Sequence, residues 1–196
     1  MQDEAVSAAK AAVEAAKVGG AFEEGVTMGP VSSKAQLDTV TNYIQQGIDE
    51  GATLVTGGTT PPEGRNTGYF VQPTVFSDVR NDMVIAQEEI FGPFATFLTF
   101  DTVDEAVAIA NASKFGLVSY VWTEDLSTAM RCARDIRAGT VWVNTAMIRD
   151  LRAPFGGYKE SGIGRDGPQA SLEFFTELKA TIIPIDPVKG HRYGAA

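Results

Sequence analysis

Segments with the composition of strands alternate at short intervals with segments of helical periodicity along this 196-residue chain. Residues 94–100, 117–123 and 140–144 are rich in β-branched and aromatic side chains, which favour strands. Between them, residues 102–110 and 125–137 repeat apolar side chains at helical spacing. This alternation is typical of a mostly parallel sheet covered by helices on both faces, so we predict an α/β fold.

Capping residues mark where two of the helices begin. Ser33 before Gln36, and Thr102 before Glu105, form capping-box patterns. The helix over residues 125–137 is expected to bury one apolar stripe, made of Leu126, Ala129, Met130, Ala133 and Ile136.

Further elements are predicted outside these segments. Helices are expected over residues 2–17 and 169–175, and a short strand over residues 53–56. Residues 69–79 have an extended pattern that contains Pro73. Because proline donates no backbone hydrogen bond, this segment is predicted to be an edge or bulged strand.

Composition excludes several classes of function. Acidic residues outnumber basic ones 25 to 16, and the net charge is -9. This charge repels phosphate backbones, so a nucleic acid is not expected as a partner. The sequence contains no apolar run long enough for a bilayer and no secretory leader, so we expect a cytoplasmic protein. One cysteine and one histidine form neither an internal disulfide nor a zinc site, and no metal site is expected.

Residues 87–93, which we call the acidic turn, have the sequence Gln-Glu-Glu-Ile-Phe-Gly-Pro and precede a predicted strand. The Gly-Pro pair ends the preceding element, because proline lacks an amide hydrogen and restricts the residue before it. Acidic and aromatic side chains are therefore held on a short turn at the edge of a strand, where small-molecule sites are common.

The acidic turn resembles the cofactor-proximal turn of the aldehyde dehydrogenase superfamily. Two more motifs agree with this resemblance, Gly-Thr-Val-Trp-Val-Asn at residues 139–144 and Pro-Phe-Gly-Gly-Tyr-Lys-Glu-Ser-Gly at residues 154–162. The resemblance covers residues 6–185. It implies NAD or NADP as cofactor, with Glu89 bonding the nicotinamide ribose and Phe91 lying near the nicotinamide. It also implies that Phe155 lines the substrate tunnel. A turn acid and two packing phenylalanines are the alternative.

Arg149 and Arg152 precede the second motif and bear on the substrate. The Ile-Arg-Asp-Leu-Arg run at residues 148–152, followed by Ser-Gly-Ile-Gly-Arg, resembles the branch that oxidises hydroxymuconic semialdehydes. A guanidinium would bind a substrate carboxylate through paired hydrogen bonds. An ion pair with Asp150 is the alternative.

Three other features are interpreted without a catalytic role. Residues 162–167 match G-x-G-x-x-G, but no strand precedes them and Pro168 follows, so they are not a dinucleotide fingerprint. Cys132 falls within a predicted helix, where a free cysteine is usually an inert packing residue. His191 has no partner in the sequence and is expected to be solvated.

The resemblance places the family's cofactor domain, general-base glutamate and nucleophilic cysteine upstream of the matched stretch. We therefore expect residues 1–176 to form a partial catalytic domain, residues 177–186 an oligomerisation strand and residues 187–196 a tail.

One hypothesis is that the chain is a truncated or split aldehyde dehydrogenase. In that case it would be inactive alone, would bind the cofactor weakly or not at all, and would need an N-terminal half as partner. A non-catalytic binding or assembly protein is the other. The C-terminal strand predicts a homo-oligomer in both cases. A third, weaker hypothesis is an unrelated thiol enzyme that uses Cys132.

Overall fold

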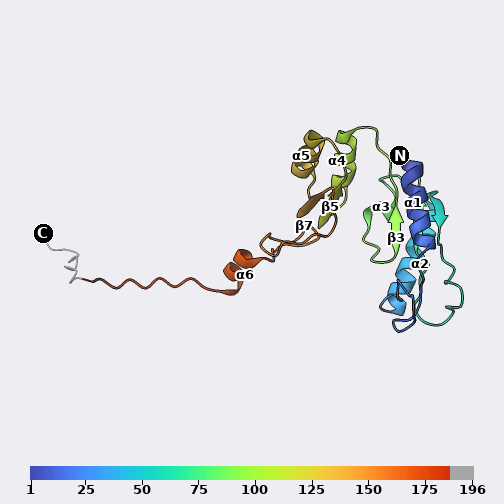
Figure 1. The fold of residues 1–196 in the computed structure, drawn as a ribbon, viewed down its shortest axis with the longest axis horizontal. Helices are drawn as coiled ribbons and strands as arrows, with labels where there is room; N and C mark the ends of the chain where they lie inside the picture. The colour runs from blue at the N-terminus through green and yellow to red at the C-terminus, as the bar shows by residue number, and fades with distance from the viewer. Residues whose placement is uncertain (186–196) are drawn as a thin grey trace.

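The computed structural model describes residues 1–185, which form two regions and an extended arm (Figure 1). Residues 1–100 are called the first region and residues 101–167 the second region. Helix α6 (Pro168–Phe175) follows, and residues 176–185 are called the arm. The predicted tail at residues 187–196, with His191, lies outside the described residues.

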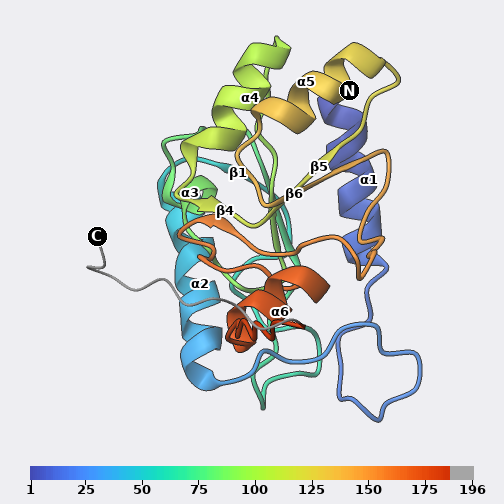
Figure 2. The same cartoon turned by 90° about the vertical axis from the view of Figure 1, so that its left-hand side faces the viewer.

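The first region is a three-stranded sheet flanked by helices. Its elements are α1 (Gln2–Glu14), α2 (Lys34–Asp49), β1 (Thr53–Thr56), β2 (Thr74–Ser77), α3 (Val84–Gln87) and β3 (Phe94–Thr96). Strand β1 pairs antiparallel with β2, and β2 pairs parallel with β3. In Figure 2 these strands run between α1 and α2. Helix α2 begins as its capping pattern predicts, because Ser33 Oγ accepts a hydrogen bond from the Gln36 amide at 3.1 Å.

The hydrophobic core of the first region lies between α2 and the sheet. Val40 and Ile44 of α2 are fully buried and belong to one cluster with Phe76 of β2 and Ile85 of α3. Phe76 also stacks on Phe94 of β3, with ring centroids 5.3 Å apart. The middle of the acidic turn packs into this cluster through Ile90, which is 8% exposed. The turn is therefore anchored to a packed core.

The position of β2 differs from the prediction for residues 69–79. It lies in the middle of the sheet, and all of its residues are buried, so the edge alternative was wrong. For the bulged alternative, the register of the β1–β2 pairing shifts between Leu54 and Thr56, so the irregularity lies on the β1 side of the pair. Pro73 stands directly before the first paired residue, Thr74, whose amide donates to the Pro93 carbonyl at 2.9 Å. The missing proline donor therefore falls outside the ladder.

The second region contains α4 (Val103–Ala112), β4 (Phe115–Gly116), β5 (Val118–Val121), α5 (Leu126–Asp135), β6 (Thr140–Val143) and β7 (Tyr158–Lys159). Strands β5 and β6 are parallel, and β4 and β7 are antiparallel. Thr102 caps α4 as predicted, and Asp125 caps α5 by accepting from the Thr128 amide at 2.7 Å. The α/β fold is confirmed, with the strands of this chain divided among three sheets.

Helix α5 packs through a different face from the predicted stripe. Ala129 and Cys132 are buried, whereas Leu126 is 74% and Met130 65% exposed, and Ala133 is exposed as well. The buried face is rotated by roughly 65° from the centre of the apolar stripe, about two thirds of one residue step of a helix. Small side chains on that face allow α5 to lie close to β5 and β6. The stripe prediction was therefore wrong for Leu126, Met130 and Ala133.

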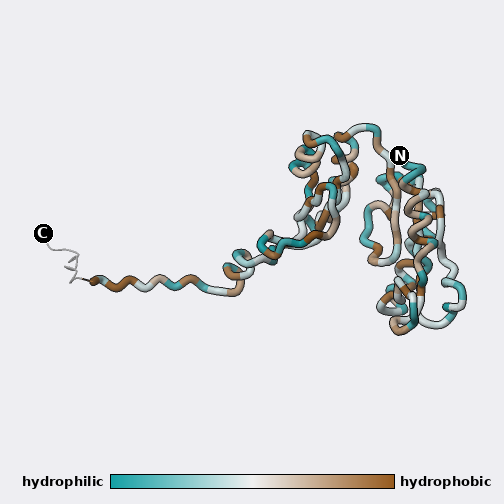
Figure 3. The backbone as a smooth tube through the Cα atoms, viewed as in Figure 1, coloured by the Kyte–Doolittle hydropathy of each residue, from teal (hydrophilic) through white to brown (hydrophobic). Residues whose placement is uncertain are grey.

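Beyond α6 the chain leaves both regions. The arm runs extended and pairs with no strand of residues 1–185 (Figure 1). It carries four apolar side chains that are at least 79% exposed: Leu178, Ile182, Ile183 and Ile185. Figure 3 shows these apolar residues along the arm. In the described part of the chain, no helix has the length and apolarity needed to cross a membrane.

Candidate functional site

The acidic turn is held by contacts to its backbone and its ends. Gln36 of α2 donates from Nε2 to the carbonyls of Ile90 and Phe91, at 2.9 and 3.0 Å. A side chain at position 92 would come within 2.5 Å of Val40 Cγ2, so only glycine fits the close approach of the turn to α2. Glu88 forms an ion pair with Lys114 at 3.0 Å. Both ends and the middle of the turn are therefore fixed.

Phe91 has a backbone conformation that is unusual for a bulky residue. Its φ is 54°, in the left-handed region, and its ring is 79% exposed. A phenylalanine in this conformation costs free energy and persists only where its surroundings impose it. An exposed aromatic ring on a strained, firmly held turn is a feature of binding sites.

Glu89 is exposed on the same turn, and no hydrogen bond or ion pair from residues 1–185 involves its carboxylate. It lines a hollow of about 550 Å³, which we call the Glu89 hollow. Ser113, Phe115 and Ser161 of the second region line the other side. The carboxylate therefore faces a space between the two regions and is free to accept hydrogen bonds from a ligand.

Glu88 differs from Glu89 in this respect. Its pairing with Lys114 raises the pKa of that lysine, mainly through the side-chain hydrogen bond. Lys114 belongs to the second region, so this ion pair joins the two regions. Glu88 therefore has a structural role.

Phe155 is half-buried and held by its backbone. Its amide donates to the Asp166 carbonyl at 2.8 Å, and the Asp166 amide donates back at 2.7 Å. The guanidinium carbon of Arg149 lies 5.0 Å from the centre of the Phe155 ring, within the range of a cation–π contact. The structure thus brings these two predicted substrate residues together.

Phe155 lines a second hollow of about 380 Å³, called the Phe155 hollow, with Phe174 and Phe175 of α6. Leu117 and Ser161 line both hollows, so the Glu89 hollow and the Phe155 hollow adjoin. Glu89 and Phe155 therefore line neighbouring hollows. Phe91 lines neither of them and instead lines a separate hollow of about 340 Å³ together with Glu89. Arg149 lines neither of the two hollows and reaches them only through its contact with Phe155.

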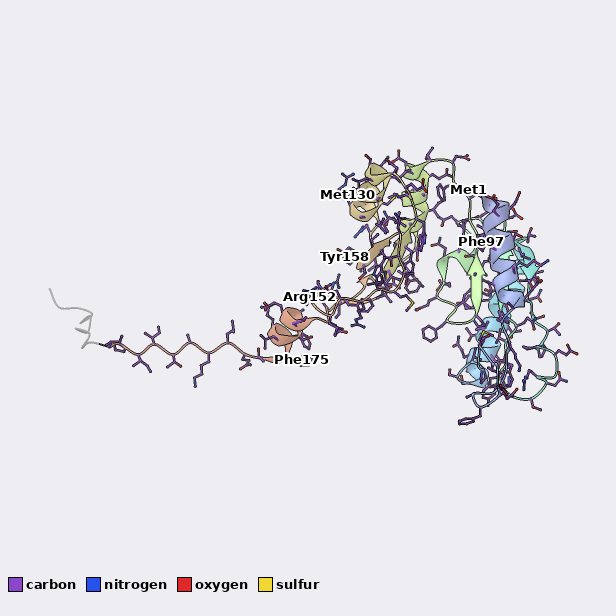
Figure 4. All side chains as sticks on the ribbon, viewed as in Figure 1. Met1, Phe97, Met130, Arg152, Tyr158 and Phe175 are labelled. Carbon is purple, nitrogen blue, oxygen red and sulfur yellow. The ribbon has the colours of Figure 1, made fainter. Side chains whose placement is uncertain are left out.

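Arg152 is engaged elsewhere. Its guanidinium donates to both carboxylate oxygens of Asp150, at 2.9 and 2.7 Å, and its side chain is 88% exposed. This hydrogen bonding holds the pKa of Asp150 below its usual value. Arg152 lines neither hollow, and the alternative stated for it, an ion pair with Asp150, is the arrangement observed. Figure 4 labels Arg152.

Cys132 is 6% exposed in α5 and lines neither hollow, in agreement with the predicted packing role. The G-x-G-x-x-G match at residues 162–167 leads into α6 through Gly167 at φ 142°, with Pro168 as the first helical residue. The two-residue strand β7 ends at Lys159, shortly before this match, so the expectation that no strand precedes it holds only for the two residues directly before Gly162.

Sequence reasoning missed two residues at the site. Gln36 was recognised only as a helix-capping partner, although its side chain also bonds the acidic turn. Lys159, at φ 53°, donates from Nζ to the carbonyls of Asn111 and Ser113 and so supports the wall of the Glu89 hollow. Both contacts join residues about 50 positions apart, and no local pattern signals them.

Comparisons with known proteins are consistent with this geometry. The sequence model of the aldehyde dehydrogenase family matches residues 1–181. A betaine aldehyde dehydrogenase of Rhizobium johnstonii is 46% identical over 188 residues, which cover 96% of this chain and 39% of that protein.

Solved structures agree with the sequence matches. An aldehyde dehydrogenase of Mycobacterium tuberculosis complexed with NAD⁺ superposes with a TM-score of 0.87 and 44% identity, over 96% of this chain and 38% of that one. The NAD⁺ complex of an aldehyde dehydrogenase from Bacillus cereus gives 0.86 and 43%, over 94% and 37%. The chain therefore spans somewhat more than a third of the length of these relatives.

Proposed function

Because the chain belongs to the aldehyde dehydrogenase family, we propose that it contributes part of the site of an NAD(P)-dependent aldehyde dehydrogenase. The family reaction oxidises an aldehyde to a carboxylate. In this proposal residues 1–176 form part of a catalytic domain, residues 177–186 an oligomerisation strand and residues 187–196 a tail. The cytoplasmic location expected from the sequence remains a prediction.

One observation carries the proposal: the acidic turn is rigidly held while its two functional side chains are free. The Glu89 carboxylate, which has no hydrogen-bond or ion-pair partner within residues 1–185, suits the paired hydroxyls of a ribose. The exposed Phe91 ring provides a flat wall beside a nicotinamide. The bound cofactor would accept the hydride of the aldehyde. Glu89 and Phe91 would only orient it, since neither side chain is a nucleophile toward the aldehyde.

Residues 1–196 alone are proposed to be inactive. Cys132 is the single cysteine of the sequence, and it is buried in α5 away from both hollows. One carboxylate and one ring do not replace a phosphate-binding domain, so cofactor binding by this chain alone is expected to be weak or absent. An N-terminal aldehyde dehydrogenase half is the partner that would complete the site.

A chimera tests this proposal. The chain would replace the matching C-terminal 39% of the betaine aldehyde dehydrogenase of Rhizobium johnstonii. We expect the chimera to form reduced cofactor, and Glu89→Gln to raise its KM for NAD⁺ more than it lowers kcat. Gln45→Leu, on the exposed side of α2, is the matched control. A folded chimera whose KM does not respond to Glu89→Gln would contradict the role of Glu89.

For the substrate, we propose an aldehyde that carries a carboxylate, as hydroxymuconic semialdehydes do. Arg149 supports this class because its guanidinium lies against Phe155 and forms no salt bridge with an acid of residues 1–185. The relatives named betaine aldehyde dehydrogenases favour a cationic substrate instead, which Arg149 would repel. Arg152 is engaged by Asp150 and contributes less to substrate binding.

Two substrates distinguish these classes in the chimera. We expect kcat/KM to be higher for a carboxylated semialdehyde than for betaine aldehyde, and Arg149→Met to reverse the preference. Arg152→Met is the matched control and should have a small effect. Preference for betaine aldehyde in the unmodified chimera would contradict the carboxylate proposal.

A non-catalytic assembly protein is the second candidate, favoured by the exposed apolar arm. An unpaired extended segment with apolar side chains associates readily with the sheet edge of another copy. Light scattering of the full chain and of a variant ending at Thr176 tests this association. We expect the full chain to form an oligomer and the truncated variant to be a monomer. The same number of subunits in both proteins would contradict this role of the arm.

A further inference from the structure

We propose that Gln36 is a positioning residue that holds Phe91 in its left-handed conformation and so aims Glu89 and Phe91 at the cofactor. The part of this inference that concerns the cofactor rests on the proposed function. The part that concerns the backbone of Phe91 rests on the structure alone.

The contact joins distant parts of the first region. Gln36 lies in the first turn of α2, and its Nε2 reaches the carbonyls of two successive turn residues, Ile90 and Phe91. A primary amide has two N–H groups, so one nitrogen satisfies both carbonyls. An ammonium or hydroxyl at this position would not reproduce both the reach and the geometry of the two bonds.

The two bonded carbonyls flank the strained residue. The Ile90 carbonyl belongs to the peptide unit before Phe91, and the Phe91 carbonyl to the unit after it. Fixing both peptide units fixes φ and ψ of Phe91 together. Neither side chain of the proposed site supplies this restraint, because the Phe91 ring is 79% exposed and Glu89 is exposed.

Gln36 is itself placed by its own helix. Its amide donates to Ser33 Oγ at the N-terminus of α2, and Val40, one turn further along, contacts Gly92. Helix α2 therefore presents Gln36 and Val40 on one face toward the acidic turn. The cap of α2, the side-chain amide of Gln36 and the close approach of Val40 to Gly92 together hold the turn in place.

Nuclear magnetic resonance of the full chain tests the backbone part. In the unmodified protein and in the control Gln45→Leu, we expect the couplings and chemical shifts of Phe91 to report a positive φ. In Gln36→Leu this signature is expected to disappear, while the resonances of the core residues Phe76 and Ile44 stay in place. Retention of the positive φ in Gln36→Leu would overturn the proposal.

A conservative variant provides a rescue that general loss of packing would not give. In Gln36→Glu an ionised carboxylate repels both carbonyls, whereas the protonated acid donates one hydrogen bond. The Phe91 signature is therefore expected to be absent near neutral pH and to return in part below about pH 4. The Gln45→Glu variant, titrated in parallel, should show no such change, and a signature in Gln36→Glu that does not respond to pH would contradict the donor role.

The cofactor part is measured in the chimera. We expect Gln36→Leu to weaken NAD⁺ binding roughly 10-fold, as is common when a supporting contact is lost, with little change for Gln45→Leu. Unchanged affinity, together with a lost Phe91 signature, would show that the contact is structural only and overturn the positioning role. A chimera that binds no NAD⁺ in any form would instead refute the proposed function, and the backbone measurement would still decide the contact.

Discussion

The first and second regions differ in how completely they bury their apolar side chains. Ten buried apolar residues lie between Val40 and Ile90, whereas the second region contributes two, Ala129 and Cys132. Every residue of β2 is buried, but every residue of the parallel strand β6 is half-buried. Parallel strands are normally covered on both faces. The first region has its own core, and the second region offers surfaces that the proposed remainder of a catalytic domain would cover.

Aromatic residues illustrate the same contrast. Phe76 is fully buried, while Tyr120 of β5 stacks on Trp142 of β6 and remains 41% exposed. Trp122, just beyond β5, is 67% exposed. Burial of a large apolar side chain stabilises a fold by about 1.5–3 kcal/mol, so the second region gains less from its aromatic residues than the first. We therefore expect the two regions to have different stabilities.

The largest predicted effect compares two phenylalanines of the first region. Phe76→Ala should destabilise the first region by about 3–5 kcal/mol, because it leaves a cavity in the core. Phe91→Ala should change stability by less than about 0.5 kcal/mol, because the ring is 79% exposed. Urea denaturation followed by circular dichroism measures both. Equal losses would mean that the ring of Phe91 packs in solution and is not free for a ligand.

A smaller effect is expected on how readily the second region opens, which the rate of thiol labelling at Cys132 measures. It is the single cysteine of the sequence and is buried in α5, so a thiol reagent reaches it only when that region opens. We expect labelling of Cys132, separated from the cysteines of the N-terminal half by peptide mass spectrometry, to slow at least about 10-fold in the chimera, equivalent to about 1.4 kcal/mol. In the chimera the remaining catalytic domain would cover the second region.

Labelling under unfolding conditions provides the control for this comparison, since it should be equally fast in both proteins. Equal labelling rates in native buffer would contradict the view that the second region lacks cover.

The smallest predicted effect concerns an ion pair within the first region. Arg65 donates to Glu23 Oε1 at 2.8 Å, and this hydrogen bond lowers the pKa of Glu23 from the ordinary 4.5. A lowered folded-state pKa adds stability above the unfolded pKa, and that stability is lost as the pH falls through the folded value. Carboxyl shifts of Glu23 should titrate below pH 4.5 and return toward it in Arg65→Met. Identical midpoints in the two proteins would exclude the ion pair in solution.

Local features of the fold were predictable from sequence. The caps at Ser33 and Thr102 and the bounds of Thr53–Thr56 follow from neighbouring residues, and they were found where expected. The central position of β2 and the buried face of α5 depend on which distant segments pack against them. Local sequence patterns therefore predicted both of them wrongly. Gln36 shows the same limit at the site, since its partners lie 54 and 55 residues away.

The site was predictable only in part, because local motifs indicate its residues but not the contacts that they make. Motif resemblance indicated Glu89, Phe91, Phe155 and Arg149. In the structure Glu89 and Phe155 line two adjoining hollows, Phe91 shares a different hollow with Glu89, and Arg149 lies against Phe155. The sequence pattern does not show which partner each of Arg149 and Arg152 has. Their difference arises from Asp150, which pairs with Arg152 and leaves Arg149 to Phe155.

The absorbance of reduced cofactor, followed with the purified chain, NAD⁺ and a carboxylated semialdehyde, tests the central claim most directly. Because the chain has orienting groups but no sulfur nucleophile at the site, we expect this absorbance to rise no faster with the protein than without it. The Cys132→Ser variant should give the same result. Turnover by the unmodified chain that Cys132→Ser abolishes would contradict the account, because the buried cysteine would then be the nucleophile of a complete enzyme.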